Sequence, residues 1–334
     1  MKRLFAAVLV IAAAMAAEGY HVLTKIKIGG TGGWDYVTAD ATNHRLYVSH
    51  GSQVEVVDTE QGKVIGIVTD TPGVHGIALA HDFNKGFISS RGKNAAIAFD
   101  LKTFEKTGES KAGNNPDAIC YEPKTKHVFA INHSGQDATA IDAKSGDVVA
   151  TIPTGPQGEF CAVDGAGKVY VNLEASSELL EIDAAKNEVT RRMKLEPCDG
   201  PTGLAIDTKN KKLFAVCGNK MMAVVDIPSF KVVATPGIGA GPDAAAYDPG
   251  TGLAFSSNGE GTLTIVKLVN GKYEPVETVQ TERGARTMAV DEKTHKIYLP
   301  AAEYGPAPEA KEGQKKGGRA PMLPDSFHLL VVGK

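Results

Sequence analysis

The sequence lacks several features that would assign it to a common functional class. It contains no C-x-x-C-H haem-attachment motif and no histidine-rich copper pattern, which argues against a redox cofactor. After the N-terminus it has no run of eighteen apolar residues, so no transmembrane helix is expected in the mature chain. A formal net charge of -3 also predicts no general attraction to nucleic acid or to anionic membranes.

The N-terminus has the pattern of a secretory signal peptide. Two basic residues precede the apolar run 4–15, and small residues follow it. We expect the signal peptide to span residues 1–17 and to be cut near Ala16 or Ala17, which places the mature protein in the periplasm or outside the cell. The alternative is a permanent anchor, but the apolar run is short for the roughly twenty residues that a membrane span needs.

The mature chain is built from seven copies of one motif, spaced by about forty residues. Each copy has a short apolar strand, a turn and a second strand. The copies begin at Asp35, Ile77, Asp117, Phe160, Thr202, Asp243 and Met288. A repeat of this length made of strands and turns is typical of a propeller blade. The sequence therefore predicts an all-β protein, a single seven-bladed β-propeller of four-stranded antiparallel blades over residues 18–334.

The two ends of the chain are expected to close the ring. Residues 20–28 predict a strand that has no repeat of its own, and residues 327–332 predict a third strand that lacks an outer partner. A propeller must cover the open edge of its last blade. We therefore expect the N-terminal strand to complete that blade.

The repeats resemble those of a known family. Leu46-Tyr-Val-Ser-His50 and Val169-Tyr-Val-Asn172 are similar to the Tyr-Val-Thr-Asn repeat of the YVTN family of seven-bladed β-propellers, and the likeness extends over the mature chain. The family is extracytoplasmic and mostly uncharacterised, so the resemblance implies binding or scaffold roles more than catalysis. More distantly, the chain is similar to seven-bladed propeller lactonases and to the propeller domains of nitrite and nitrous oxide reductases.

Two sets of variable residues are expected to surround one end of the central channel, because each inner strand starts, and each second strand ends, on the same side of its blade. The first set is Asp35, His75, Asp117, Glu159, Thr202, Asp243 and Arg286. The second set is His50, Arg91, His133, Glu174, Cys217, Asn258 and Glu303. The acids, imidazole and guanidinium of the first set make this end the candidate ligand site, together with Arg91 and Trp34. Trp34 could stack on a ligand or pack between blades.

Three interpretations of this ring are open. Its carboxylates and imidazole could hold a divalent cation, since oxygen ligands suit calcium or magnesium and an added imidazole suits zinc or manganese. The candidate metal ligands are Asp35, His75, Asp117, Glu159 and Asp243. An acid paired with His75 or Arg286 could instead serve general acid–base chemistry on a small substrate such as a lactone. In the third interpretation the groups only solvate the channel mouth as ion pairs. No other cofactor is implied.

The four cysteines belong to a chain bound for an oxidising compartment, where disulfides form. Cys198 lies in the loop that enters the fifth blade and Cys217 ends the second strand of that blade, so a Cys198–Cys217 disulfide is predicted. Cys120 and Cys161 lie on neighbouring inner strands but one register apart, so their side chains should point to opposite faces. Both are therefore expected to be buried free thiols.

The last blade departs from the pattern through a long insert at about 304–325. Its proline, glycine and lysine content predicts an extended, flexible loop on the channel-mouth face. The insert is a tolerated surface insertion, a lid over the channel or a basic contact for an anionic partner. The residues that would make this contact are Lys311, Lys315, Lys316 and Arg319.

Two functional classes remain. We prefer a periplasmic or secreted binding or scaffold propeller whose partner, a protein, peptide, glycan or small ligand, contacts the channel-mouth face. Nucleic acid is disfavoured because a phosphate backbone needs a positive groove. The alternative is a lactonase-like hydrolase, with or without a metal, that uses the acids with His75 and Arg286.

Overall fold

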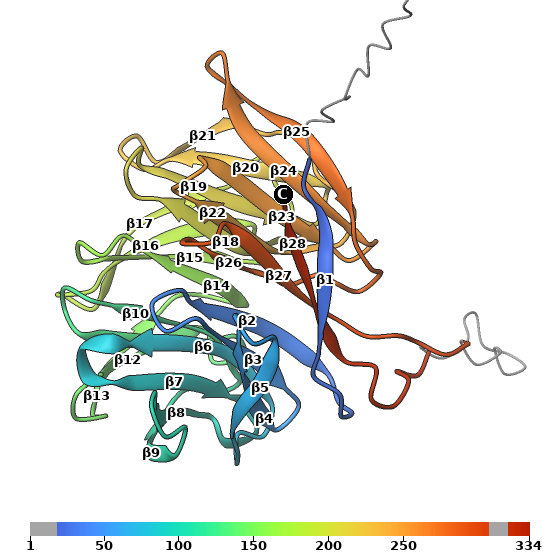
Figure 1. The fold of residues 1–334 in the computed structure, drawn as a ribbon. Helices are drawn as coiled ribbons and strands as arrows, with labels where there is room; N and C mark the ends of the chain where they lie inside the picture. The colour runs from blue at the N-terminus through green and yellow to red at the C-terminus, as the bar shows by residue number, and fades with distance from the viewer. Residues whose placement is uncertain (1–18, 307–319) are drawn as a thin grey trace, which may run out of the picture.

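Seven β-sheets surround a central axis in the computed structural model, which describes residues 19–306 and 320–334 (Figure 1). Each sheet has four strands, and neighbouring strands are antiparallel. The first strand of each blade contacts the first strands of both neighbouring blades, so these inner strands form a ring. The predicted all-β seven-bladed propeller is therefore confirmed.

The strands have the following bounds. Blades 1 and 2 contain β2 (Trp34–Asp40), β3 (Arg45–His50), β4 (Gln53–Asp58) and β5 (Lys63–Val68), then β6 (Val74–Ala80), β7 (Lys85–Ser90), β8 (Ala95–Asp100) and β9 (Lys106–Lys111). Blades 3 and 4 contain β10 (Pro116–Glu122), β11 (His127–Asn132), β12 (Asp137–Asp142) and β13 (Val148–Pro153), then β14 (Gly158–Val163), β15 (Lys168–Leu173), β16 (Glu178–Asp183) and β17 (Glu188–Lys194). Blades 5 and 6 contain β18 (Pro201–Asp207), β19 (Lys212–Cys217), β20 (Met221–Asp226) and β21 (Lys231–Ala234), then β22 (Pro242–Asp248), β23 (Leu253–Asn258), β24 (Thr262–Val269) and β25 (Lys272–Gln280). Blade 7 contains β26 (Ala289–Asp291), β27 (Lys296–Ala301), β28 (His328–Gly333) and β1 (His21–Lys27). Two short 3-10 helices, η1 (His81–Phe83) and η2 (Arg91–Lys93), lie in the turns of blade 2.

A buried aspartate ends the inner strand in several blades and explains the Asp of the repeat motif. Asp40, Asp207, Asp248 and Asp291 all lie in the interior. Each accepts a hydrogen bond from the backbone of the turn that follows, as Asp207 does from Asn210 N at 3.0 Å. A carboxylate that satisfies turn amides in this way fixes the reversal into the second strand. The motif therefore builds the blades.

The hydrophobic core lies between the faces of neighbouring blades. Phe129 of blade 3 and Leu180 of blade 4 belong to one continuous buried cluster. Phe214 of blade 5 stacks on Tyr247 of blade 6, with 5.4 Å between the ring centroids. Neighbouring inner strands approach closely, and a Cβ atom at Gly203 would clash with the backbone of Ala245 in the next blade. Face-to-face packing of the sheets thus places the starts of all the inner strands around one ring.

The N-terminal strand β1 closes this ring. It pairs with β28, with Ile26 opposite Leu329, and gives the last blade the strand order β1-β28-β27-β26. The prediction that the N-terminal strand completes the last blade is confirmed, and Figure 1 shows the blue β1 beside the red β28. The chain then turns into blade 1 at Gly30, whose φ is 79° and where a Cβ atom would lie 3.0 Å from the ring of His50. Only glycine fits this turn without strain.

All four cysteines form disulfides. The structure contains the Cys198–Cys217 disulfide that the sequence predicts, with 5.6 Å between the Cα atoms. The expectation that Cys120 and Cys161 are free thiols is wrong, because they form a second disulfide with Cα atoms 6.3 Å apart.

The packing of the blades explains this second disulfide. Cys120 pairs with Phe129, the third residue of β11, whereas Cys161 pairs with Val171, the fourth residue of β15. Because successive residues of a strand alternate between its faces, the two cysteine side chains point to opposite faces of their own sheets. Because neighbouring blades pack face to face, these are the two faces that meet between blades 3 and 4. Both cysteines belong to one buried cluster there.

The insert of the last blade joins β27 to β28, and its two described ends pair with each other. Tyr304 forms a β-bridge with Met322, and Leu323 N donates a hydrogen bond to the carbonyl of Glu303 at 2.8 Å. In Figure 1 the coloured ends of this connection extend away from the sheets. Residues 307–319, with the four basic residues predicted to contact a partner, and residues 1–17, predicted to be a signal peptide, lie outside the described residues. Within the described ranges, no helix is long and apolar enough to span a bilayer.

Truncating a buried side chain of β1 should weaken the closure of the ring. Ile26 is 5% exposed and Leu23 in the same strand is 39% exposed. We expect Ile26→Ala to lower the free energy of unfolding by about 2–5 kcal/mol, because it removes buried methyl groups and leaves a cavity. The control Leu23→Ala should change it by no more than about 0.5 kcal/mol. Urea denaturation measures both, and equal effects of the two variants would contradict a role of Ile26 in closure.

Removing either disulfide should destabilise the fold. The disulfides join residues 41 and 19 positions apart, at Cys120–Cys161 and Cys198–Cys217. From the entropy of loop closure we expect the Cys120→Ala/Cys161→Ala variant to lose about 4 kcal/mol of unfolding free energy and the Cys198→Ala/Cys217→Ala variant about 3 kcal/mol. Guanidinium denaturation without reductant measures these losses. A wild-type protein whose denaturation midpoint does not move when reductant is added would argue against both disulfides.

Candidate functional site

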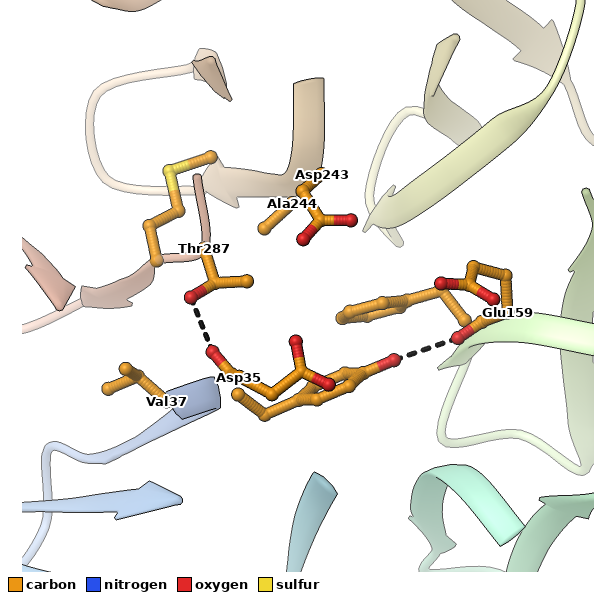
Figure 2. Close-up of a pocket in the computed structure, with 9 residues that line it drawn as sticks. Asp35, Val37, Glu159, Asp243, Ala244 and Thr287 are labelled. Carbon is orange, nitrogen blue, oxygen red and sulfur yellow. Dashed lines mark hydrogen bonds between the residues drawn. The ribbon is translucent and has the colours of Figure 1, made fainter. Parts of the chain in front are cut away.

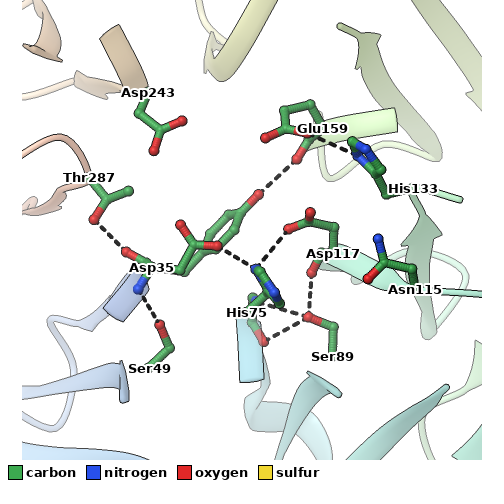
Figure 3. A network of polar contacts seen from close by, with 12 residues as sticks. Asp35, Ser49, His75, Ser89, Asn115, Asp117, His133, Glu159, Asp243 and Thr287 are labelled. Carbon is green, nitrogen blue, oxygen red and sulfur yellow. Dashed lines mark hydrogen bonds and ion pairs between the residues drawn. The ribbon is translucent and has the colours of Figure 1, made fainter. Parts of the chain in front are cut away.

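The second side chains of five inner strands, together with one side chain just before the inner strand of blade 7, meet at one end of the axis, and Figure 3 shows most of them from close by. We refer to this ring as the mouth. Its residues are Asp35, His75, Asp117, Glu159, Asp243 and Arg286. They come from six different blades, so the candidate site depends on the packing of the whole propeller.

Hydrogen bonds from the second strands fix the positions of these inner strands. Ser89 Oγ accepts a hydrogen bond from Gly76 N at 2.8 Å and donates one to the backbone carbonyl of Asp117 in the next blade. Asn172 joins blades 4 and 5 in the same way, and Ser257 joins blades 6 and 7 at the carbonyl of Arg286. Each of these side chains ties together two neighbouring inner strands beside the mouth, so rigid sheets position the mouth residues.

The first group of mouth residues consists of Asp35, His75 and Asp117. His75 Nδ1 hydrogen-bonds to the carboxylate of Asp35 and lies 3.3 Å from Asp117 Oδ1 (Figure 3). One potential ligand atom from each residue lies within 4.8 Å of the others. One imidazole and two carboxylates at this spacing have the composition of a divalent cation site.

The second group consists of Asp117, His133 and Glu159. His133 follows β11 directly, and its Nδ1 lies 3.2 Å from Glu159 Oε2. The ligand atoms of these three residues also lie within 4.8 Å of one another. Asp117 therefore belongs to both groups, and Figure 3 shows it between His75 and His133.

Arg286 places a positive charge on the side of the mouth that holds Asp243 and Asp35. Its guanidinium forms an ion pair with Asp243 and lies 3.6 Å from Asp35 Oδ1. The mouth thus contains four carboxylates and one guanidinium. Among the described residues, the cationic groups within 4 Å of Asp117 and Glu159 are the two histidines.

Two stacked rings close the channel beneath the mouth. Tyr36 reaches across the axis from blade 1 and stacks on Phe160 of blade 4, with 5.2 Å between the ring centroids. Its hydroxyl donates a hydrogen bond to the backbone carbonyl of Glu159 at 2.7 Å (Figure 2). The space left beside these rings is about 20 Å³, which is room for about one water molecule. The mouth is consequently a cup with a floor.

A larger cavity of about 210 Å³ opens beside the first group. Its lining includes Trp34, His75, Arg91 and Arg286. Trp34 also stacks on Phe327 at 5.0 Å between centroids, so it packs at the seam of blades 1 and 7 while it lines the cavity. Arg91 is exposed and forms no ion pair with a carboxylate of the described residues, which leaves its guanidinium accessible.

Burial and neighbouring charges shift the ionisation of the mouth. Burial raises the pKa of the Asp117 and Asp243 carboxyl groups to about 7 each. Burial lowers the pKa of the His75 imidazole, but the hydrogen bond to Asp35 and the charge of Asp117 together raise it above its ordinary value. The adjacent Glu159 carboxylate raises the pKa of His133. Burial is therefore the largest cause of the two aspartate shifts, and the neighbouring carboxylates of the mouth add to it.

The second set of sequence-predicted residues contributes mainly His133. Glu174 lies near Glu159, and burial followed by the charge of Glu159 raises its pKa. His50 is buried within blade 1, where its ring lies 3.2 Å from Glu55, and Cys217 forms a disulfide with Cys198. The sequence alignment placed His133 at the mouth without marking it as a ligand. The repeats alone do not show that blade 4 places Glu159 beside His133.

The Asp243→Asn variant should change the pH dependence of stability. The pKa of Asp243 is about 7 in the folded protein and about 3.9 in an unfolded chain. The contribution of Asp243 to the free energy of unfolding is therefore fully present below about pH 4, and it is lost as the pH rises towards 7. We expect Asp243→Asn to flatten the fall in unfolding free energy between about pH 5 and pH 7. Urea denaturation in the presence of a chelator measures this profile.

Asp226→Asn is the control for that experiment. A hydrogen bond from Ser229 lowers the pKa of Asp226 to about 2, so this group contributes to the pH dependence only at acid pH. Its replacement should leave the slope between about pH 5 and pH 7 unchanged. If the unfolding free energy of Asp243→Asn varies with pH in parallel with that of the wild type, the raised pKa of Asp243 is contradicted.

Comparisons with known proteins bear on the fold. No family model matches the chain, and no curated protein matches it. Among solved structures, the chain is similar to hydrazine synthase from Kuenenia stuttgartiensis, with a TM-score of 0.72 and 16% sequence identity over 84% of this chain and 96% of that chain. A likeness at this identity shows the fold alone, so the resemblance to the YVTN repeat stays a prediction. The geometry and the comparison together establish a seven-bladed β-propeller.

Proposed function

We propose that the protein is an extracytoplasmic binding module whose ligand site is the mouth. The signal-peptide pattern and the two disulfides support an oxidising compartment. The floor made by Tyr36 and Phe160 supports binding in a cup rather than passage along the channel. The resemblance to the YVTN repeat implies a role of the same kind.

The proposed ligand is a divalent cation held by Asp35, His75 and Asp117. The observation that carries the proposal is the state of Asp117. Its side chain is 10% exposed, and its carboxylate accepts no hydrogen bond from residues 19–306 or 320–334. Its near neighbour, His75 Nδ1, already donates to Asp35. A buried carboxylate in this state is unfavourable unless its charge is compensated, either by the proton that its raised pKa retains up to about pH 7 or by a bound cation.

The donor set favours some cations over others. An imidazole beside carboxylates suits zinc or manganese, whereas calcium prefers a shell of oxygen atoms alone. The shape of the cup supports a small ligand, because the ring is rigid and closed beneath. The ion could be the whole ligand or could hold an anionic molecule in the neighbouring cavity.

A lactonase-like hydrolase is the second candidate function. The cavity of about 210 Å³ that contains His75 and Arg286 favours it, because a substrate there would lie beside the proposed cation. A cation lowers the pKa of a bound water, and a guanidinium stabilises negative charge that develops on a carbonyl oxygen. Hydrolysis of simple lactones by the metal-loaded protein, lost in Arg286→Gln, would support this candidate over a binding module.

Titration with metal ions tests the proposed cation site. The protein is stripped with a chelator and titrated with Zn²⁺, Mn²⁺ and Ca²⁺ in an isothermal calorimeter. We expect Zn²⁺ and Mn²⁺ to bind more tightly than Ca²⁺. Asp117→Asn should weaken binding at least about 10–100-fold, the range known for the loss of a residue that only supports a ligand.

The matched control is Asp199→Asn, since Asp199 is an exposed aspartate in the loop that enters blade 5. It should bind the metal as the wild type does. Absence of binding by the wild type, or equal binding by the Asp117→Asn variant, would refute the cation site.

A further inference from the structure

We propose that the mouth holds a second divalent cation at Asp117, His133 and Glu159, and that Asp117 bridges the two ions. This inference rests on the proposed function and extends it from one ion to a pair. Each group supplies one imidazole and one carboxylate of its own, and both share the carboxylate of Asp117. A carboxylate has two oxygen atoms with lone pairs on both, so one residue can bind two metal ions.

The position of Asp117 fits a bridging ligand. Its carboxylate lies between the two histidines in Figure 3, with Oδ1 3.3 Å from His75 Nδ1. The backbone of Asp117 is held by Ser89 from the neighbouring blade, so the side chain starts from a fixed point. Ions that share a bridging carboxylate are typically about 3.5–4 Å apart, and the two groups of ligand atoms overlap at this one residue.

The second group has unsatisfied polar atoms of its own. Within residues 19–306 and 320–334, His133 Nδ1 is buried and makes no well-aligned hydrogen bond, although it lies 3.2 Å from Glu159 Oε2. A metal ion between these two groups would satisfy both of them at once. Asn115 Oδ1 is also buried without a hydrogen-bond partner among those residues, and Figure 3 shows this side chain beside Asp117.

The distribution of charge favours an ion on this side of the mouth. Arg286 compensates Asp243 and approaches Asp35, but it forms no ion pair with Glu159. Glu174 adds a further carboxylate near Glu159. An ion bound only by the first group would leave Glu159 and Glu174 facing His133. A second ion compensates both acids, and this is why we assign a pair of cations as the ligand.

Stoichiometry and magnetic coupling test the pair. The full chain is stripped with a chelator and titrated with Mn²⁺, and binding is followed by calorimetry and electron paramagnetic resonance. We expect two ions per chain and, at saturation, a spectrum of exchange-coupled manganese. His133→Gln should bind one ion and show the hyperfine pattern of isolated Mn²⁺. Asp35→Asn should also bind one ion, and Asp117→Asn should lose the coupling together with most of the affinity.

Two controls separate loss of the site from loss of the fold. His81→Gln removes an exposed histidine that lies 3.6 Å from Asp40, away from the two groups, and it should bind two coupled ions. The melting temperature of each chelated variant shows whether the propeller is intact. If Asp117→Asn does not fold, the charge-preserving variant Asp117→Glu takes its place. That variant should retain both ions but alter the magnetic coupling between them.

The outcomes distinguish this inference from the proposed function. One ion per wild-type chain, unaffected by His133→Gln, would overturn the pair and leave the single cation site standing. Two ions that show no coupling and persist in Asp117→Asn would overturn the bridge. No bound ion at all would refute both proposals.

Discussion

Face-to-face packing of neighbouring blades is the constraint on which the rest of this structure depends. Each sheet is apolar on both sides, so it is stable only between two others, and seven sheets satisfy this need by closing a circle. Closure requires a fourth strand in the last blade, which β1 supplies. It also brings the inner strands together at the axis, where their first residues meet. The mouth is therefore a consequence of how the core is buried.

The two sides of the mouth differ in how their charges are balanced. On one side Arg286 pairs with Asp243 and approaches Asp35, so a permanent cation of the protein compensates the acids. On the other side Asp117, Glu159 and Glu174 face histidines, whose charge depends on protonation. Histidine can exchange its proton for a metal ion, whereas arginine cannot. One side therefore has a permanent positive charge among its acids, whereas the charge balance of the other side changes with the protonation of its histidines.

The sequence predicts the blades well because each blade is a local unit. The repeat, the turn aspartates and the unmatched strands at the two ends all belong to segments of about forty residues. The composition of the mouth follows from aligning those repeats. Contacts between blades are another matter, because spacing along the chain does not say which residues face each other across the axis or between sheets. This is why the Cys120–Cys161 disulfide, the stack of Tyr36 on Phe160 and the shared position of Asp117 emerge only from the structure.

The Cys120–Cys161 disulfide joins the inner strands that carry Asp117 and Glu159. Each cysteine lies within three residues of one of these acids. The covalent link therefore limits how far the two carboxylates can separate when their charges repel. A buried cysteine pair thus tethers the two strands beneath a polar site at the surface.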